Sequence, residues 1–196
     1  MLPSVKIHRN ALAQLLCASV EPFKKECLGI LFGSLPTKTN NQFVITYVQP
    51  LQCVNRKRFT RVEVPDKRWS RFKKFFSKIP GRSRYIGDFH SHAEWGENSE
   101  PLAEMSKQDI DSMQKDGYAL EILISISSCK GRPNLWAVQD DGSLSGSYGN
   151  EDYMYDFVIS AYVLEPNYTQ KPTPKKIKII APEFIKAFNY ALDHRS

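Results

Sequence analysis

The spacing of apolar residues along the chain predicts alternating helices and strands. Residues 10–20 and 66–79 each place large apolar side chains on one helical face, with Asn10 as the expected cap of the first. A further helix is predicted over residues 106–115. Apolar runs predict strands at residues 26–33, 43–54, 85–92, 120–127 and 134–139. This alternation predicts an α/β arrangement of layers.

The character of the chain changes beyond Gly149. An aromatic segment, residues 153–164, is followed by a proline-containing stretch and then by a last helix that begins near Pro182. We therefore expect a main domain over residues 1–148 and a C-terminal extension, residues 149–196, packed on its core.

Composition indicates an ordinary globular chain of 196 residues. Its longest apolar runs are too short to span a bilayer, and residues 1–10 lack the apolar core of a signal peptide. A soluble cytoplasmic protein without membrane contact is therefore expected. The cysteines form no C-x-x-C pair, which argues against a disulfide framework or a thiolate zinc site; they are Cys17, Cys27, Cys53 and Cys129.

The net charge of +6 conceals an uneven distribution. Residues 56–84 hold twelve Lys or Arg and two acids, whereas residues 85–121 hold nine acids and two bases. A basic segment of this kind can meet nucleic acid or an acidic protein surface. The predicted helix there separates aromatic from charged side chains as an ordinary surface helix does, so nucleic-acid binding is a lesser alternative.

Two of the four histidines form the triplet His90-Ser-His92 near the end of a predicted strand. Because side chains alternate between the faces of a strand, residues two apart point the same way, about 6.5–7 Å from each other. That spacing suits two imidazoles on one metal ion. Two exposed histidines at a strand end would give the same triplet, so the motif needs support from elsewhere in the chain.

That support comes from the next helix, where Ser106 and Asp109 have the spacing of a capping pair. The same geometry presents a hydroxyl and a carboxylate together at a helix start. With the two histidines, Asp109 would complete three protein ligands and leave a fourth position open, as catalytic zinc sites require. Glu26, an acid at the mouth of an apolar strand, is the best candidate for a general base.

Other histidine-based enzymes fit the sequence less well. Metallo-β-lactamases and amidohydrolases need further histidines, but only His8 and His194 remain, at the two ends of the chain. The H-E-x-x-H motif is absent, the P-C-x-x-C partner of zinc deaminases is missing, and no G-x-S-x-G elbow precedes a helix.

Taken in order, three segments resemble the signature of the JAMM (MPN+) metalloproteases: Glu26 to Gly33, Gly87 to His92, and Ser106 to Asp109. The resemblance spans about residues 5–140. It implies a mixed sheet flanked by helices, related in architecture to cytidine deaminases. It also implies zinc-dependent cleavage of peptide or isopeptide bonds after the C-termini of ubiquitin-like proteins, with such a protein or its conjugate as partner and with homo- or heterodimers.

The resemblance also assigns roles. His90, His92 and Asp109 correspond to the zinc ligands, Glu26 to the general acid and base, and Ser106 to the hydroxyl that stabilises the oxyanion. Residues 1–148 would then form the catalytic domain. A non-catalytic MPN-type scaffold that binds partners is a further alternative, although such scaffolds usually lack one or more of these five residues.

Two departures concern the rim of the site. The family usually has proline after the second histidine, where this chain has Ala93. Thirteen residues, Ala93 to Met105, separate that histidine from the serine, about six more than is usual in the family. Trp95 in this loop is a candidate substrate contact. Asp88 shares strand parity with the histidines and is a candidate partner of a ligand or of the substrate tail.

Overall fold

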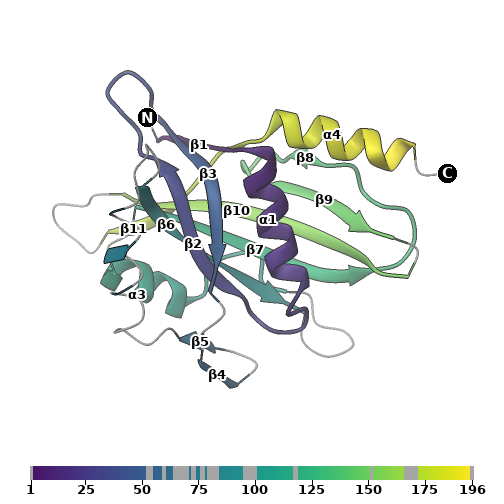
Figure 1. Ribbon diagram of the computed structural model, residues 1–196, viewed down its shortest axis with the longest axis horizontal. Helices are drawn as coiled ribbons and strands as arrows, with labels where there is room; N and C mark the ends of the chain where they lie inside the picture. The colour runs from purple at the N-terminus through teal and green to yellow at the C-terminus, as the bar shows by residue number, and fades with distance from the viewer. Residues whose placement is uncertain are drawn as a thin grey trace.

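A computed structural model of the chain describes residues 2–51, 55–58, 61–63, 71, 74, 75, 78, 84–94, 101–116, 119–150, 152–165 and 172–194. The fold is mixed α/β and is dominated by one ten-stranded sheet (Figure 1). The helices among the described residues are α1 (Arg9–Val20), α3 (Lys107–Asp116) and α4 (Pro182–Asp193). In this part of the chain, none of them combines the length and apolar character needed to cross a bilayer.

The strands of the large sheet run in the order β12-β1-β3-β2-β6-β7-β10-β9-β8, and β11 pairs with β10. Their bounds are β1 (Ser4–Ile7), β2 (Leu28–Ser34), β3 (Gln42–Pro50), β6 (Arg84–Ala93), β7 (Leu120–Cys129), β8 (Ala137–Val138), β9 (Leu144–Gly149), β10 (Met154–Glu165), β11 (Thr173–Ile177) and β12 (Ile179–Ile180). β4 (Asn55–Arg58) and β5 (Arg61–Glu63) pair as a separate two-stranded antiparallel sheet.

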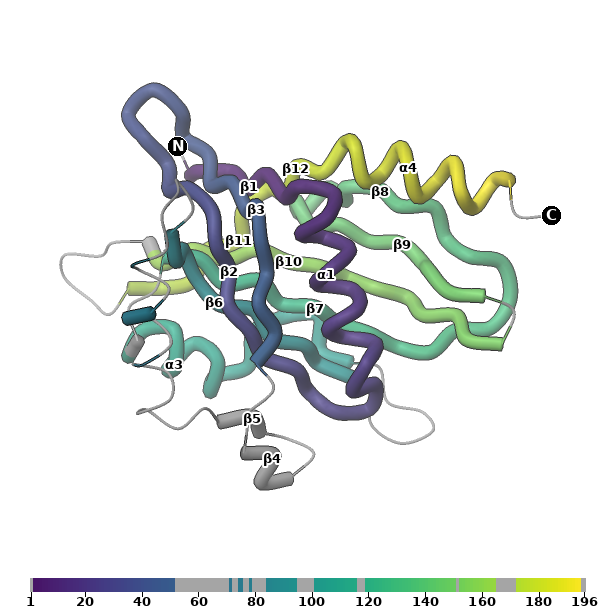
Figure 2. Tube along the Cα trace, in the orientation of Figure 1, coloured from purple at the N-terminus to yellow at the C-terminus, as the bar shows by residue number. Residues whose placement is uncertain are grey.

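The two ends of this sheet approach each other. The backbone N–H of Ile179 in β12 donates to the carbonyl of Gly142, in the turn between β8 and β9, at 2.9 Å. In Figure 2 the late strand β12 accordingly lies next to β1, the first strand of the chain. The sheet is therefore nearly closed, like a barrel.

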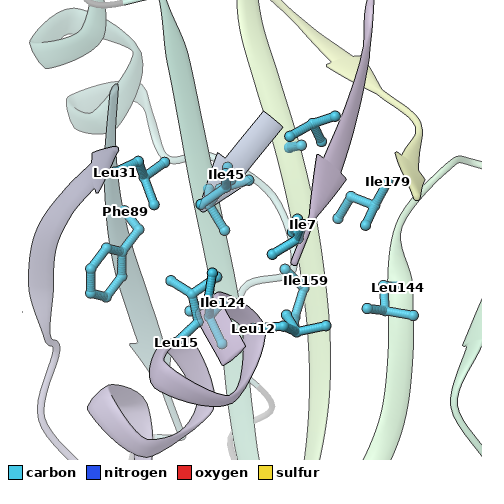
Figure 3. Packing of buried hydrophobic residues seen from close by; sticks show 14 of the residues in the cluster. Ile7, Leu12, Leu15, Leu31, Ile45, Phe89, Ile124, Leu144, Ile159 and Ile179 are labelled. Atoms are coloured by element: carbon cyan, nitrogen blue, oxygen red, sulfur yellow. The ribbon is translucent and has the colours of Figure 1, made fainter. Parts of the chain in front are cut away.

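One face of the sheet forms the hydrophobic core beneath α1 and α4. Leu12 and Leu15 of α1 are fully buried there among side chains from β1, β3, β7 and β10 (Figure 3). On β6, Phe89 belongs to this core. Because strand side chains alternate, His90 and His92 must project from the opposite face, which leaves them free for chemistry.

Residues 154–165 are an interior strand of this sheet. β10 pairs with β7 from Met154 to Tyr162 and with β9 from Met154 to Ile159. Its alternate side chains, together with Phe184 of α4, belong to the same core cluster as Leu12. The expected C-terminal extension is thus built into the framework of the sheet, beyond simply packing on its surface.

Several local expectations need correction or fall outside the described residues. Helix α1 begins at Arg9, with His8 rather than Asn10 as its N-cap and no capping bond from the His8 side chain. The expected strand at residues 134–139 is reduced to β8, and β9 was not expected from the sequence. The predicted helix at 66–79 lies almost wholly outside the described residues.

Gly29 lets β2 lie close against its neighbours. A Cβ atom at this position would stand 2.2 Å from the Phe89 ring and 2.6 Å from the carbonyl oxygen of Gln49. The ring can shift, but the backbone oxygen cannot move without disturbing the pairing of β2 with β3. We expect Gly29→Ala to lower the free energy of unfolding by about 1–3 kcal/mol, the usual cost of overpacking. A urea-unfolding midpoint equal to that of the natural protein would contradict this expectation.

Candidate metal centre

His90 and His92 project together from β6, on the face opposite the main core. Both imidazoles are largely buried, and their Nε2 atoms lie 3.2 Å apart. The intervening Ser91 is fully buried on the other side, where its hydroxyl accepts the N–H of Cys27. The strand alternation expected from the sequence is therefore confirmed here.

Asp109 reaches the histidines from the first turn of α3. Its Oδ1 lies 3.5 Å from Nε2 of His90, and its Oδ2 lies 3.3 Å from Nε2 of His92. The expected capping pair is present: the Ser106 N–H donates to Asp109 Oδ2 at 2.7 Å, and the Asp109 N–H donates to Ser106 Oγ at 3.3 Å. The cap holds the carboxylate at the helix start and leaves the hydroxyl proton of Ser106 available to donate elsewhere.

These three side chains are suited to hold one metal ion. Their candidate ligand atoms all lie within 4.8 Å of one another. Ligands about 2.0–2.2 Å from a tetrahedral ion stand about 3.4 Å apart. The two Nε2 atoms are 3.2 Å apart, and Asp109 approaches them through different oxygens, Oδ1 at 3.5 Å from His90 and Oδ2 at 3.3 Å from His92. Two imidazole nitrogens with one carboxylate oxygen also form a donor set that catalytic zinc accepts.

The second nitrogen of each imidazole already has a partner. Nδ1 of His90 lies 2.7 Å from Oε1 of Glu121, and Nδ1 of His92 lies 3.0 Å from the carbonyl of Leu102. Because a carboxylate or carbonyl oxygen accepts, each Nδ1 carries the hydrogen, and each Nε2 is the atom left for an ion. The Leu102 carbonyl is itself fixed by the Ser125 hydroxyl at 2.5 Å.

The charges around the site favour a cation. Burial by itself lowers the pKa of His90, but hydrogen bonds to Asp109 and Glu121 outweigh it and raise that pKa to about 10. Burial acts in the opposite sense on Asp109, whose pKa is nevertheless held well below its usual range by hydrogen bonds to both imidazoles. Two carboxylates thus surround one imidazole, and a positive charge between them is stabilised.

Glu26 stands beside this cluster, two residues before β2. The register pairs Leu28 with His90, so continuing it would set Glu26 opposite His92, on the same face. Burial raises the pKa of the Glu26 carboxyl, His92 and His90 oppose that rise, and Asp109 adds to it. The carboxyl is therefore half-buried and within electrostatic reach of all three metal candidates.

Of the two remaining residues that the sequence singled out, Asp88 is described by the structure and Trp95 is not. Asp88 is half-buried and has the strand parity of the two histidines, and it is the cross-strand partner of Glu121. Trp95 lies outside the described residues.

Sequence reasoning missed Glu121. The residue is only 1% exposed, and it comes from β7, the parallel neighbour of β6. The signal was present: Glu121 is the single charged residue in the apolar run from Leu120 to Ile126. A carboxylate buried in such a strand needs a partner, and His90 supplies it.

We expect Glu121 to tune metal affinity through His90. Groups that hydrogen-bond to a metal-binding imidazole typically change affinity by about 10–100-fold when removed. Glu121→Gln, which keeps an acceptor but loses the charge, should weaken metal binding toward the lower end of that range, and Glu121→Ala toward the upper end. Competition with a chromophoric chelator measures both. Unchanged affinity in the alanine variant, beside an exposed control such as Glu183→Gln, would refute the role.

Comparison with known proteins bears on the fold. No protein-family model matches the sequence, and no curated protein matches it. Among solved structures, the chain is similar to the solution structure of protein DSY2949 from Desulfitobacterium hafniense, with 12% identity and a TM-score of 0.54. The similarity covers 90% of this chain and 92% of that one. At this identity, it establishes a shared chain arrangement and carries nothing about activity.

Proposed function

We propose that this protein is a zinc-dependent peptidase or isopeptidase of the JAMM type, which cleaves after the C-terminus of a ubiquitin-like protein. The observation that carries the proposal is the convergence of His90, His92 and Asp109, whose candidate ligand atoms lie within 4.8 Å of one another, with the Glu26 carboxyl beside them. We further propose that the mixed sheet and its helices form an MPN-type domain, with layers like those of cytidine deaminases.

Zinc held by these three side chains would have a catalytic role. When bound by the two Nε2 atoms and the Asp109 carboxylate, zinc would act as a Lewis acid that acidifies water and polarises the scissile carbonyl. The Nδ1–H bonds to Glu121 and to the Leu102 carbonyl hold the two rings in the required orientation.

Glu26 would move the proton. Hydrolysis joins a water oxygen to the carbonyl carbon and breaks the C–N bond. The Glu26 carboxylate takes one proton from that water and delivers it to the departing nitrogen. Burial raises the pKa of this carboxyl, which makes it a stronger base and suits it to both steps.

Ser106 would stabilise the negative charge that develops on the carbonyl oxygen. Its Oγ already accepts the Asp109 N–H, so the orientation of the hydroxyl is restricted while its proton remains free to donate. A donor of this kind typically contributes about 3–4 kcal/mol of transition-state stabilisation.

A thiol nucleophile is disfavoured at Cys27. Cys27 follows Glu26 directly, but its side chain belongs to the core on the other face. Burial raises the pKa of its thiol, whereas a nucleophilic cysteine needs a lowered one. Cleavage should therefore be insensitive to thiol reagents.

The test combines metal analysis with a cleavage assay. The purified protein should contain about one zinc per chain and should release the C-terminal partner from at least one member of a panel of ubiquitin-like fusions. Phenanthroline should abolish cleavage, added zinc should restore it, and serine and thiol reagents should leave it unchanged. Cleavage that persists in a zinc-depleted sample would refute the mechanism.

A further inference from the structure

Ser91, between the two histidines, has a buried hydroxyl that the proposed chemistry leaves unexplained. Its side chain is fully buried on the core face, away from the metal candidates. The hydroxyl oxygen accepts the backbone N–H of Cys27 at 2.9 Å, and the Ser91 N–H donates to the Cys27 carbonyl at 3.0 Å. Ser91 therefore holds residue 27 by two hydrogen bonds.

This contact stands where the regular pairing of β2 with β6 stops. β2 begins at Leu28, whose partner is His90, so the Cys27–Ser91 pair lies one residue beyond the strand. In a regular antiparallel pair the two residues would exchange N–H···O=C bonds. Here the Ser91 side chain replaces its own carbonyl as acceptor, so one of the two hydrogen bonds in this last link between the strands depends on that hydroxyl.

The amide that Ser91 holds belongs to the peptide unit that joins Glu26 to Cys27. Fixing that planar unit fixes the chain immediately after the Glu26 Cα. On the other side of Glu26 the chain leaves a turn, in which the Lys25 N–H donates to the Pro22 carbonyl at 2.8 Å and Lys24 has a φ of 71°. Glu26 thus lies between a turn and a bond supplied by the residue between the two histidines.

We propose that Ser91 is a positioning residue, which ties the backbone after Glu26 to β6 and so holds the Glu26 carboxyl in register with the metal ligands. This inference rests on the proposed function. The segment His90 to His92 would then have two roles. One face of it would supply the two histidine ligands, and the other face would fix the distance of the Glu26 carboxyl from those ligands. A displacement of about 1 Å in a catalytic group can cost about a hundredfold in rate, so losing the tether should be visible in kcat.

The test compares variants that keep or remove the hydroxyl. Ser91→Ala should retain zinc and the KM of the natural protein, while kcat falls about 10–100-fold. Ser91→Thr should restore most of the loss, since it keeps the acceptor oxygen. The matched control is Ser19→Ala: Ser19 is equally buried and contacts Cys27 through its thiol, with Oγ 3.7 Å from Sγ, rather than through the backbone amide. It should leave kcat unchanged.

A second readout does not depend on activity. The amide hydrogen of Cys27 should exchange with solvent at least about tenfold faster in Ser91→Ala than in the natural protein or in Ser19→Ala, because that amide loses its acceptor. If Ser91→Ala does not fold, Ser91→Thr and Ser91→Val form a pair of similar size, and the valine variant should show the lower kcat and the faster exchange.

The outcomes separate this inference from the proposed function. If Ser91→Ala loses zinc, the residue acts through the histidines and the inference is overturned; an unchanged kcat in zinc-loaded Ser91→Ala overturns it as well. If the zinc-loaded natural protein cleaves no fusion, the proposed function fails. The exchange measurement alone then tests whether Ser91 holds the backbone after Glu26. Faster exchange at Cys27 then still supports the tether, and unchanged exchange removes it.

Discussion

Glu26→Gln is expected to reduce kcat severely while leaving zinc content and unfolding midpoint close to those of the natural protein. Glutamine has nearly the same shape as glutamate but cannot take up a proton at neutral pH. General acid–base groups contribute about 10²–10⁴-fold in rate, so kcat should fall within or beyond that range with little change in KM. The fold should tolerate the change because the Glu26 side chain is half-buried and precedes β2.

The control is Glu21→Gln, an exposed glutamate just after α1 that should behave as the natural protein does. Initial rates on a cleavable fusion, with zinc measured in the same samples, test whether Glu26 is the general base. A Glu26→Gln protein that retains full activity would transfer the role of base to another residue.

The second large effect is expected for metal binding. Asp109→Ala and His90→Ala each remove one of three converging ligands and should reduce zinc from about one per chain to a trace, because two protein ligands rarely retain this ion. Asp109→Ala should also fray the start of α3, since it removes the acceptor of the Ser106 N–H.

Asp111→Ala separates these two effects from general damage to the helix. Asp111 is exposed and only two residues further along α3, so its removal should leave zinc unchanged. Metal analysis after dialysis against a weak chelator gives the comparison. Full zinc retention in both ligand variants would mean that the ion, if bound, is held elsewhere.

The parts of the site that sequence could predict are those set by local geometry. The parity of His90 and His92 follows from strand alternation, and the pairing of Ser106 with Asp109 follows from the capping distance along a helix. Both need only a few consecutive residues. The order of the motifs along the chain predicts that the histidine pair and the Ser106–Asp109 pair lie together. The structure brings them together.

The missed features depend on partners far away in the chain. Glu121 bonds to His90 across 31 positions, and its role becomes visible only when β6 and β7 pair. β9 has the sequence LSGSYG, in which small and polar residues replace the apolar alternation that marks a strand. The predicted start of α1 is wrong because β1 leads almost directly into the helix, so that His8 becomes the N-cap. The His8 N–H donates to the Ile45 carbonyl at 3.0 Å, which holds His8 in this place.

The closing of the sheet has a consequence for synthesis of the protein. β1 lies between β3 and β12, so one neighbour of β1 is made soon after it, whereas the other follows all the other described strands of the sheet. A nascent chain that has not yet released residues 179–180 from the ribosome leaves one edge of β1 open, and an open edge invites pairing with other chains. Pairing over so long a sequence separation is also slow. The sheet should therefore be completed only once β12 has emerged, and chains that stop before residue 179 should aggregate rather than accumulate as a smaller folded domain.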